Sequence, residues 1–197
     1  MEAFKALEAV LLPLAQANVD TDQIVPACYL QKPRTAPFGD FLFHDLRFLK
    51  DGSENPNFIL NQVAYRDARV IVAGNNFACG SSREHAVWAL YDYGFRVVIA
   101  PSFGDIFYSN ALKNGFLPII LPSIVVTTLI KAAQTLPGAK IGIDLAAQTV
   151  SAPDGSVYPF AIDPFSRRCL LEGLDEIDYT LSQLAQITAF EQSLDVL

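Results

Sequence analysis

Residues 70–86 decide the fold of this chain, and they read VIVAGNNFACGSSREHA. The opening run of mostly β-branched residues, 70–73, is typical of a buried strand. A loop with a glycine at each end follows, and from Glu84 the apolar spacing becomes helical until Gly94. This order predicts a strand-to-helix crossover, whose free backbone N–H groups and helix dipole favour a bound anion.

The residues of this loop allow two interpretations. Ser81 or Ser82 is placed to be the N-cap of the helix, and Gly80 can serve a left-handed turn, as at any helix start. Alternatively, the two hydroxyls and the planar fork of Arg83 form a site for a small carboxylate. Capping alone does not require the whole block 80–85, GSSREH, so the sequence favours a binding or catalytic site.

The composition favours a globular chain that is covered in part by a partner. The 197 residues suffice for one well-cored domain, taken here as 1–197. Hydrophobic residues make up 51% and charged residues 18%, an apolar balance that predicts a surface buried against another chain. The net charge of −7 argues against a nucleic-acid binder but leaves room for a small anion beside a local arginine.

The three cysteines, Cys28, Cys79 and Cys169, have no metal-ligand spacing. They form no CxxC pair, which argues against a zinc site, a disulfide framework or a complete iron–sulfur ligand set. Reduced thiols of this kind are typical of a cytoplasmic protein. The N-terminus has no basic segment or cleavage site, and Pro118 and Pro122 interrupt the most apolar run, so we expect neither secretion nor a membrane span.

Around the crossover the chain alternates between strand and helix patterns. We expect strands over 9–14, 69–73, 96–100, 117–121, 140–145, 149–152 and 157–162, and helices over 84–93, 105–114, 123–134, 164–172 and 177–190. Such alternation predicts a parallel core sheet with right-handed crossovers, followed by a separate β segment. Residues 31–61 contain prolines and turn signals and are expected to form a long, partly irregular insertion, and 177–197 a helical tail.

Several segments of the chain resemble one family. The block 80–86, GSSREHA, is similar to the signature of the swivelling domain of the aconitase superfamily, and more closely to that of the small subunits of 3-isopropylmalate dehydratases. The match extends, in the family's order, to residues 18–26, to 100–108 with 114–118, and to 163–165 with 169–175. The resemblance implies an α/β fold, the three-layer β/β/α swivelling domain of aconitase type with a mainly parallel core sheet.

The resemblance also implies a reaction and a division of labour between two chains. These enzymes move a hydroxyl between adjacent carbons of a small dicarboxylate by dehydration and rehydration, which in leucine biosynthesis interconverts 2- and 3-isopropylmalate. Such chemistry needs a base, a Lewis acid on the leaving hydroxyl and clamps on the carboxylates. In this family the Lewis acid is a [4Fe–4S] cluster on the large subunit. This chain is therefore expected to bind no cofactor itself and to work in a heterodimer or heterotetramer.

The motif match assigns roles within the crossover loop. Ser81 would be the catalytic base, an alkoxide-like oxygen stabilised by the loop amides and the helix N-terminus. Ser82 would hold the substrate or the loop, and Arg83 would grip a carboxylate. Gly80 and His85 would support these residues from behind, since a histidine in a first helical turn is more often a hydrogen-bonding strut than a metal ligand.

Asp20, Thr21 and Asp22 follow the first predicted strand, so two carboxylates and a hydroxyl can project together there. These residues can form an ordinary Asx-turn and helix cap. The resemblance favours instead a role in positioning the substrate and in orienting hydrogen bonds in the site.

The next loop lies where the family sets selectivity for the substrate's side chain. Tyr29 and Leu30 offer apolar contact to an isopropyl group, and Arg34 is a candidate clamp for the second carboxylate. The chain departs from the family pattern here, because Pro37 stiffens a turn where a glycine is usual. Ala78 also replaces a usual glycine, a mild change if its φ is negative.

Two alternatives remain open at this point. A related hydro-lyase, such as homoaconitase or a citraconate or dimethylmaleate hydratase, would use the same residues on another diacid. A non-catalytic carboxylate-binding module would use the same crossover loops without a partner. The serine–arginine block and the hydrophobic surplus favour the half-enzyme over the binding module. None of these readings predicts a nucleic-acid or membrane partner.

Overall fold

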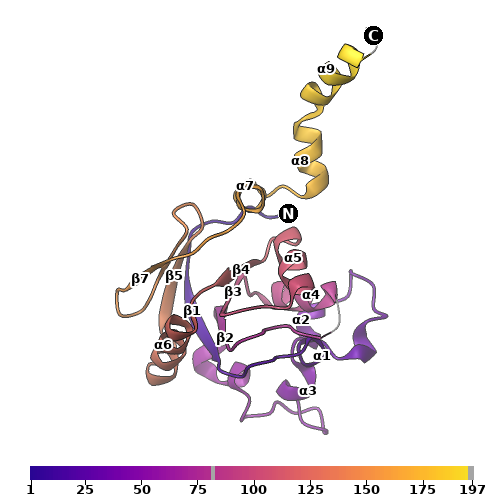
Figure 1. Cartoon of the computed structure of the whole chain (residues 1–197). Helices are drawn as coiled ribbons and strands as arrows, with labels where there is room; N and C mark the ends of the chain where they lie inside the picture. The colour runs from indigo at the N-terminus through magenta and orange to yellow at the C-terminus, as the bar shows by residue number, and fades with distance from the viewer. Residues whose placement is uncertain (81–82, 195–197) are drawn as a thin grey trace.

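A computed structural model of the chain describes residues 1–80 and 83–194. Its centre is a seven-stranded sheet with the order β4-β3-β2-β1-β5-β6-β7 (Figure 1). The strands are β1 (Leu7–Leu14), β2 (Ala68–Ala73), β3 (Val97–Ala100), β4 (Leu117–Ile120), β5 (Lys140–Asp144), β6 (Thr149–Ser151) and β7 (Val157–Pro159). Strands β1 to β4 are parallel, and β5 to β7 join them antiparallel. The expected parallel core sheet is confirmed, but the later strands are not a separate segment, because β5 pairs with β1 and extends the same sheet.

Three long helices connect or follow the parallel strands. Helix α4 (Glu84–Tyr93) joins β2 to β3, α5 (Asp105–Lys113) joins β3 to β4, and α6 (Ser123–Thr135) leads from β4 to β5. Helix α4 ends at Gly94, whose φ of 120° suits glycine and stops the helical ladder. The apolar spacing and the glycine stop are both local signals, which is why the expected range 84–93 matches.

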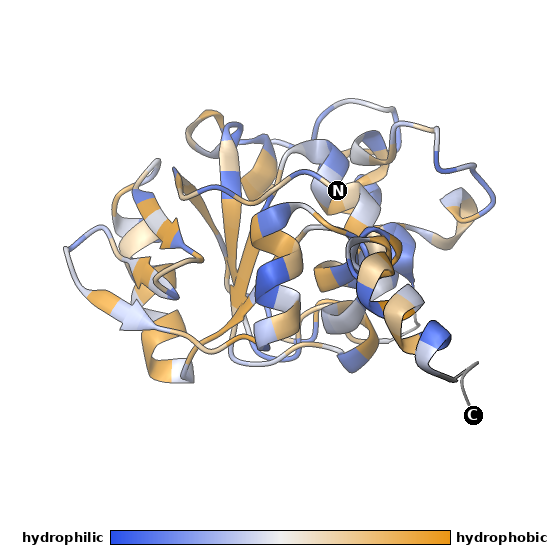
Figure 2. Cartoon of the chain, turned by 90° about the horizontal axis from the view of Figure 1, so that it is seen from above, coloured by the Kyte–Doolittle hydropathy of each residue, from blue (hydrophilic) through white to orange (hydrophobic). Residues whose placement is uncertain are grey.

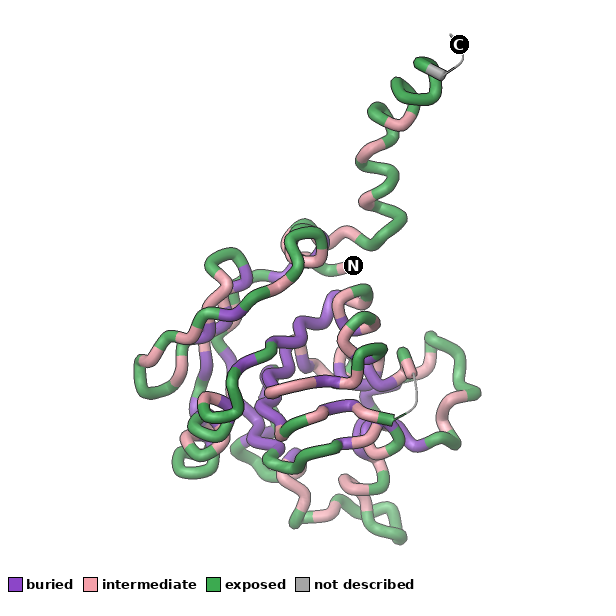
Figure 3. Tube along the Cα trace, viewed as in Figure 1, coloured by how far each residue is buried: buried purple, intermediate pink, exposed green. Residues whose placement is uncertain are grey.

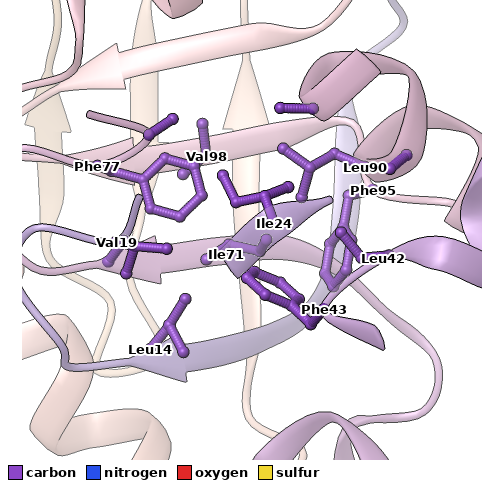
Figure 4. Packing of buried hydrophobic residues seen from close by; sticks show 14 of the residues in the cluster. Leu14, Val19, Ile24, Leu42, Phe43, Ile71, Phe77, Leu90, Phe95 and Val98 are labelled. Carbon is purple, nitrogen blue, oxygen red and sulfur yellow. The ribbon is translucent and has the colours of Figure 1, made fainter. Parts of the chain in front are cut away.

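Alternating residues of the parallel strands face two separate cores, so the molecule has three layers. Leu12, Ile71 and Val98 face the layer of α4 and α5, whereas their neighbours Leu11 and Val70 face α6 and the antiparallel strands. Figure 4 shows residues of the first core from close by. The parallel strands are mostly hydrophobic (orange in Figure 2) and mostly buried (purple in Figure 3). This arrangement confirms the three-layer α/β architecture expected from the resemblance.

The segment 31–61 is less irregular than its prolines suggest. It contains the short helices α2 (Phe38–Phe41) and α3 (His44–Arg47) and a 3-10 turn, Ile59–Asn61. Phe38, Leu42 and Phe43 are fully buried in the first core. A Cβ atom on Gly39 would lie 2.7 Å from the backbone nitrogen of Tyr93. The lack of a side chain at Gly39 therefore allows α2 to pack this closely against α4. The segment therefore forms part of the helical layer.

The C-terminal part of the chain consists of three helices rather than the two expected. Helix α7 (Pro164–Glu172), capped by Asp163, is followed by α8 (Glu176–Ser182) and α9 (Leu184–Leu194), so the continuous helix expected over 177–190 is interrupted at Gln183. Both α8 and α9 project away from the body (Figures 1 and 3). Ile177 and Phe190 are 71% and 64% exposed, and α8 contacts the body through Lys113–Glu176, 3.1 Å, and Phe165–Tyr179 ring packing.

Each outer strand of the sheet contains a proline. In β4, Leu117 and Leu121 donate their backbone N–H groups to β3 and its extension, so the nitrogen of Pro118 lies on the open side. In β7, Phe160 donates to Gln148 just beyond the strand, which places the nitrogen of Pro159 on the open side as well. Proline is tolerated at such positions because no ladder hydrogen bond is lost.

Candidate functional site

The loops that follow β1, β2 and β3 are joined by backbone hydrogen bonds at the carboxyl edge of the parallel sheet. Thr21 donates its N–H to the carbonyl of Cys79 at 2.9 Å, and Cys79 donates to Val19 at 3.1 Å. On the other side of the same loop, Phe77 donates to Ser102 at 3.0 Å. The crossover loop is therefore held between its two neighbours, at the edge where open α/β sheets bind their ligands.

Side chains that the sequence reasoning missed reinforce this junction. Ser102 donates its hydroxyl to Asn75 Oδ1 at 2.8 Å and accepts from the backbone N–H of Asn76 at 2.9 Å. The Asn76 amide in turn donates to Asn18 Oδ1 at 2.8 Å. Asn18 and Asn76 both have positive φ, a conformation that asparagine tolerates. Their one sequence signal is asparagine in the loop that follows a strand, which also fits any ordinary turn.

Gly80 and Asp20 lie against each other. Gly80 has a φ of +92°, and a Cβ atom there would be 2.2 Å from Asp20 Oδ2, so both conformation and space require glycine. Asp20 accepts from the N–H of Asp22 at 2.7 Å and forms a capping box with Gln23 at the start of α1 (Thr21–Ile24). The helix-cap interpretation of Asp20 is thus confirmed, and Thr21 is buried behind it.

Arg83 forms an ion pair with Asp22, which connects the crossover loop to the loop after β1. Its side chain is 14% exposed, whereas that of Asp22 is 53% exposed. Arg83 itself directly precedes Glu84, the first residue of α4, and its side chain does not cap the helix. The prediction that Ser81 or Ser82 caps this helix concerns two residues that lie outside the described ones. Their neighbours on either side, Gly80 and Arg83, both contact the Asp20–Asp22 turn.

Ala78 does not meet the condition for a mild change. Its φ is +56°, so this alanine adopts a left-handed conformation. Next to it, Gly80, Gly104 and Phe107 border a hollow of about 170 Å³. A Cβ atom on Gly104 would lie 2.5 Å from the carbonyl oxygen of Ala78, which shows how closely the loops after β2 and β3 approach each other.

The predicted selectivity loop begins with the 3-10 turn Ala27–Tyr29. The Tyr29 ring stacks on Phe41 at 4.2 Å between centroids and meets His44 at 5.2 Å. These rings, with Phe48, line a hollow of about 710 Å³. Burial raises the pKa of the Tyr29 hydroxyl, so this residue offers a neutral, largely apolar surface.

Leu30 and His85 connect the selectivity loop to α4. The His85 ring interacts with the backbone of Leu30, and burial lowers the pKa of His85 below its usual value. The ring also packs against Phe38 at 5.4 Å and Trp88 at 4.6 Å. His85 thus lies between α4 and the selectivity loop, in contact with both.

Arg34 is not brought together with Arg83. Its two terminal nitrogens donate to Asp92 Oδ2 and Oδ1 at 2.8 and 2.9 Å, and its guanidinium lies 5.1 Å from the centroid of the Trp88 ring. Asp92 is in the last turn of α4, whereas Arg83 precedes the first turn.

The cysteines are dispersed in the structure as in the sequence. Cys28 is exposed, Cys79 is half-buried and Cys169 is buried, where burial raises the pKa of its thiol. Over residues 1–80 and 83–194, no group of three His, Cys, Asp or Glu side chains is arranged to hold a metal ion. A search of the same residues finds no helix with the length and hydropathy needed to cross a membrane.

Comparison with known proteins places the chain in one family. The aconitase C-terminal domain matches residues 1–123, and the LeuD_N domain matches residues 127–164. The 3-isopropylmalate dehydratase small subunit of Roseobacter denitrificans is 51% identical over 193 residues, covering 98% of this chain and 96% of that protein. The small subunit of Rhodospirillum centenum is 53% identical over 191 residues, covering 97% and 94%.

A solved structure agrees with these sequence relatives. The crystal structure of 3-isopropylmalate dehydratase (LeuD) from Methanocaldococcus jannaschii superposes with a TM-score of 0.66 at 27% identity and covers 95% of this chain and 99% of that one. The chain therefore belongs to the family of 3-isopropylmalate dehydratase small subunits.

Proposed function

We propose that this chain is the small subunit of a two-chain hydro-lyase that interconverts 2-isopropylmalate and 3-isopropylmalate in leucine biosynthesis, in the cytoplasm. The observation that carries the proposal is the full-length identity of about half with named small subunits. The uninterrupted block Gly80-Ser81-Ser82-Arg83-Glu84-His85 supports it, since its described residues lie where three loops meet.

Ser81 is proposed as the base that takes the proton from the carbon next to the departing hydroxyl. The hydroxyl would take a proton from a general acid assigned to the large subunit and leave as water, giving the unsaturated diacid, and water would then add back with the opposite regiochemistry. A free serine is too weakly acidic for this role at neutral pH, so loop amides and the N-terminus of α4 must stabilise its anion. Arg83 is suited to a substrate carboxylate, because its nearly buried guanidinium is already held in position by Asp22.

The neighbouring turn would position the substrate rather than react with it. Asp20 is engaged in capping α1 and in contact with Gly80, and Thr21 is buried, so both would fix the loop geometry. Asp22 would orient Arg83 through their ion pair. Ser82 would hold the substrate or the loop beside Ser81.

Selectivity is assigned to Tyr29, Leu30 and Arg34. Tyr29 supplies a stacked aromatic surface and Leu30 an apolar side chain, at roughly 0.8 kcal/mol for each methylene of an isopropyl group that is buried. Arg34 would grip the second carboxylate of the diacid.

A large subunit is the proposed partner, in a heterodimer or heterotetramer. The described residues do not fit an iron–sulfur cluster, because their cysteines are scattered and no ligand group forms. The [4Fe–4S] cluster is therefore assigned to the large subunit, where it would supply the Lewis acid. The exposed apolar side chains of α8 and α9 are consistent with a chain that is covered by another.

Reconstitution tests the proposal. The chain is purified alone and with the cluster-bearing large subunit from the same genome, and each preparation is assayed with 2-isopropylmalate, citraconate and cis-homoaconitate. We expect no activity and no iron–sulfur absorbance for the chain alone, and turnover of isopropylmalate by the complex. A complex that prefers another diacid would identify a related hydro-lyase. Binding of diacids by the chain alone, with no active complex, would support the binding module instead.

A further inference from the structure

Three residues of α4 form a stripe that carries the selectivity loop. His85, Trp88 and Asp92 are three and four residues apart, so they share one face of the helix. The His85 ring interacts with the backbone of Leu30. The Trp88 ring lies 5.1 Å from the Arg34 guanidinium, and Asp92 accepts from Arg34 at 2.8 and 2.9 Å. We call these three residues the α4 seat.

The seat fixes both ends of the loop but leaves its middle exposed. On one side Leu30 is tied to His85. On the other, Phe38 packs against both His85 and Trp88 with 5.4 Å between centroids, and Gly39 lies against the backbone of the last turn of α4. Residues 31–35 between these anchors are exposed. Within this exposed middle, Arg34 reaches the seat through its contacts with Asp92 and Trp88.

The pairing with Asp92 competes with any carboxylate that Arg34 would bind. Both terminal nitrogens of the guanidinium are used, and these are the two that grip a carboxylate in the end-on bidentate arrangement. Asp92 is eight residues beyond the start of α4, which corresponds to about 12 Å along the helix axis. Arg34 therefore has to release Asp92 before it can grip a carboxylate beside Arg83.

We propose that Asp92 is a positioning residue for the reaction: it holds Arg34 on the α4 seat until a substrate carboxylate replaces it. The inference deepens the proposed function and rests on it, because it takes Arg34 as the second carboxylate clamp. The exchange is feasible because the Arg34 and Asp92 side chains are 48% and 22% exposed. A solvent-exposed ion pair of this kind shifts an equilibrium by only about two- to five-fold.

The first test is kinetic and uses the assembled enzyme. Asp92→Asn removes the competing carboxylate and raises the fraction of molecules with Arg34 available. We expect KM for isopropylmalate to fall by about two- to five-fold with kcat unchanged. Asp92→Glu keeps the ion pair and should restore a KM near that of the wild type. As a matched control, Glu172→Gln breaks the similarly exposed Arg168–Glu172 pair on α7 and should leave KM unchanged.

The second test observes the exchange directly. Trp88 is the single tryptophan of the chain, so 5-fluorotryptophan in this subunit, assembled with an unlabelled large subunit, gives one 19F resonance. The indole is held by its N–H bond to Asn114 at 3.2 Å, which leaves the departure of Arg34 as the expected change. Isopropylmalate should shift the wild-type resonance saturably. In Asp92→Asn, the substrate-free resonance should already lie toward the saturated position.

The outcomes separate the exchange from the proposed function. If Arg34→Ala raises KM but Asp92→Asn leaves it unchanged or raises it, Arg34 is a clamp and the exchange is wrong. If Arg34→Ala leaves KM unchanged while the complex turns over isopropylmalate, Arg34 binds no substrate, and the exchange is overturned while the isomerase assignment stands. An absent 19F shift at saturation also overturns the exchange. A wild-type complex without isomerase activity overturns both.

Discussion

Ala78 carries an unfavourable backbone conformation at the centre of the site. Its φ of +56° costs an alanine about 1–2 kcal/mol, and unlike Asn18 and Asn76 it has no polar side chain for local hydrogen bonds. We expect Ala78→Gly to raise the free energy of unfolding by up to about 1 kcal/mol, since the entropy lost by glycine offsets part of the gain. Urea denaturation measures this.

Gly104→Ala is the matched control for Ala78. Its φ of −63° is ordinary, but the added Cβ would meet the Ala78 carbonyl at 2.5 Å, so this variant should lose stability through space alone. If Ala78→Gly also lost stability, the left-handed backbone at residue 78 would not be the source of strain.

Ser81→Ala should remove most of the activity of the assembled enzyme. Proton abstraction by a positioned group contributes roughly 10²–10⁴-fold, and the substitution removes that group alone. We expect kcat to fall by that factor, while gel filtration shows the complex intact. Ser82→Ala, measured in parallel, should change KM more than kcat. A loss of only a few-fold in Ser81→Ala would assign the base to another residue.

Helix α4 makes stability depend on pH through His85. Burial lowers the pKa of this histidine, so near its ordinary pKa of about 6.5 the unfolded chain binds more protons than the folded chain. The neutral, half-buried His85 therefore stabilises the fold fully above that pH. The free energy of unfolding falls as the pH drops from about 6.5 toward 5, because protons bind the unfolded chain preferentially. His85→Asn and His85→Gln cannot titrate and should both flatten this slope in urea denaturation. Slopes equal to that of the wild type would exclude His85 as the titrating group.

The loop at the 3-10 turn should control substrate preference. All substrates in this class share the diacid part that Ser81 and Arg83 would bind and react with. Discrimination between their substituents therefore needs a different part of the pocket. Leu30→Arg removes apolar contact and should shift kcat/KM from isopropylmalate toward a diacid with an extra carboxylate, by about 10- to 200-fold in the ratio. Leu30 is half-buried and belongs to neither hydrophobic core, so we expect the substitution to leave the fold intact. An unchanged ratio of the two kcat/KM values would mean that the residues that select the substituent belong to the partner subunit.

Local signals explain which elements could be predicted. Helix α4 ends at Gly94 and β2 is a short β-branched run, so both follow from residues within one turn or strand. The pairing of Arg34 with Asp92 joins residues 58 apart, and no local pattern encodes it. The ion pair of Arg83 with Asp22 likewise joins two different loops, so the local sequence around Arg83 does not indicate it.

The molecule as a whole should fold without its last helix. Helix α9 projects from the body, and the contacts of the tail with the body come from α8 (Figure 1). We expect deletion of residues 184–197 to change the free energy of unfolding by no more than about 0.5 kcal/mol, as for other exposed surface changes. Urea denaturation of the chain alone measures this. A large loss would mean that α9 packs on the body in solution.

The same deletion should weaken binding to the large subunit if the exposed face of the tail is part of the interface. Titration calorimetry or analytical ultracentrifugation of the two chains measures the effect. Phe190→Ser offers a milder variant, since this side chain is 64% exposed and lies on α9. Unaltered affinity in both variants would place the interface elsewhere on the chain.

The prolines in the outer strands have a consequence for a subunit synthesised before its partner. An exposed sheet edge is a template for pairing with another copy, and continued pairing leads to fibrous aggregates. Pro118 and Pro159 each withdraw a backbone donor from one open edge, so neither edge offers a complete row of donors and acceptors to an incoming strand. Before it binds its partner, the free subunit can therefore expose apolar side chains without its sheet edges pairing with those of other copies.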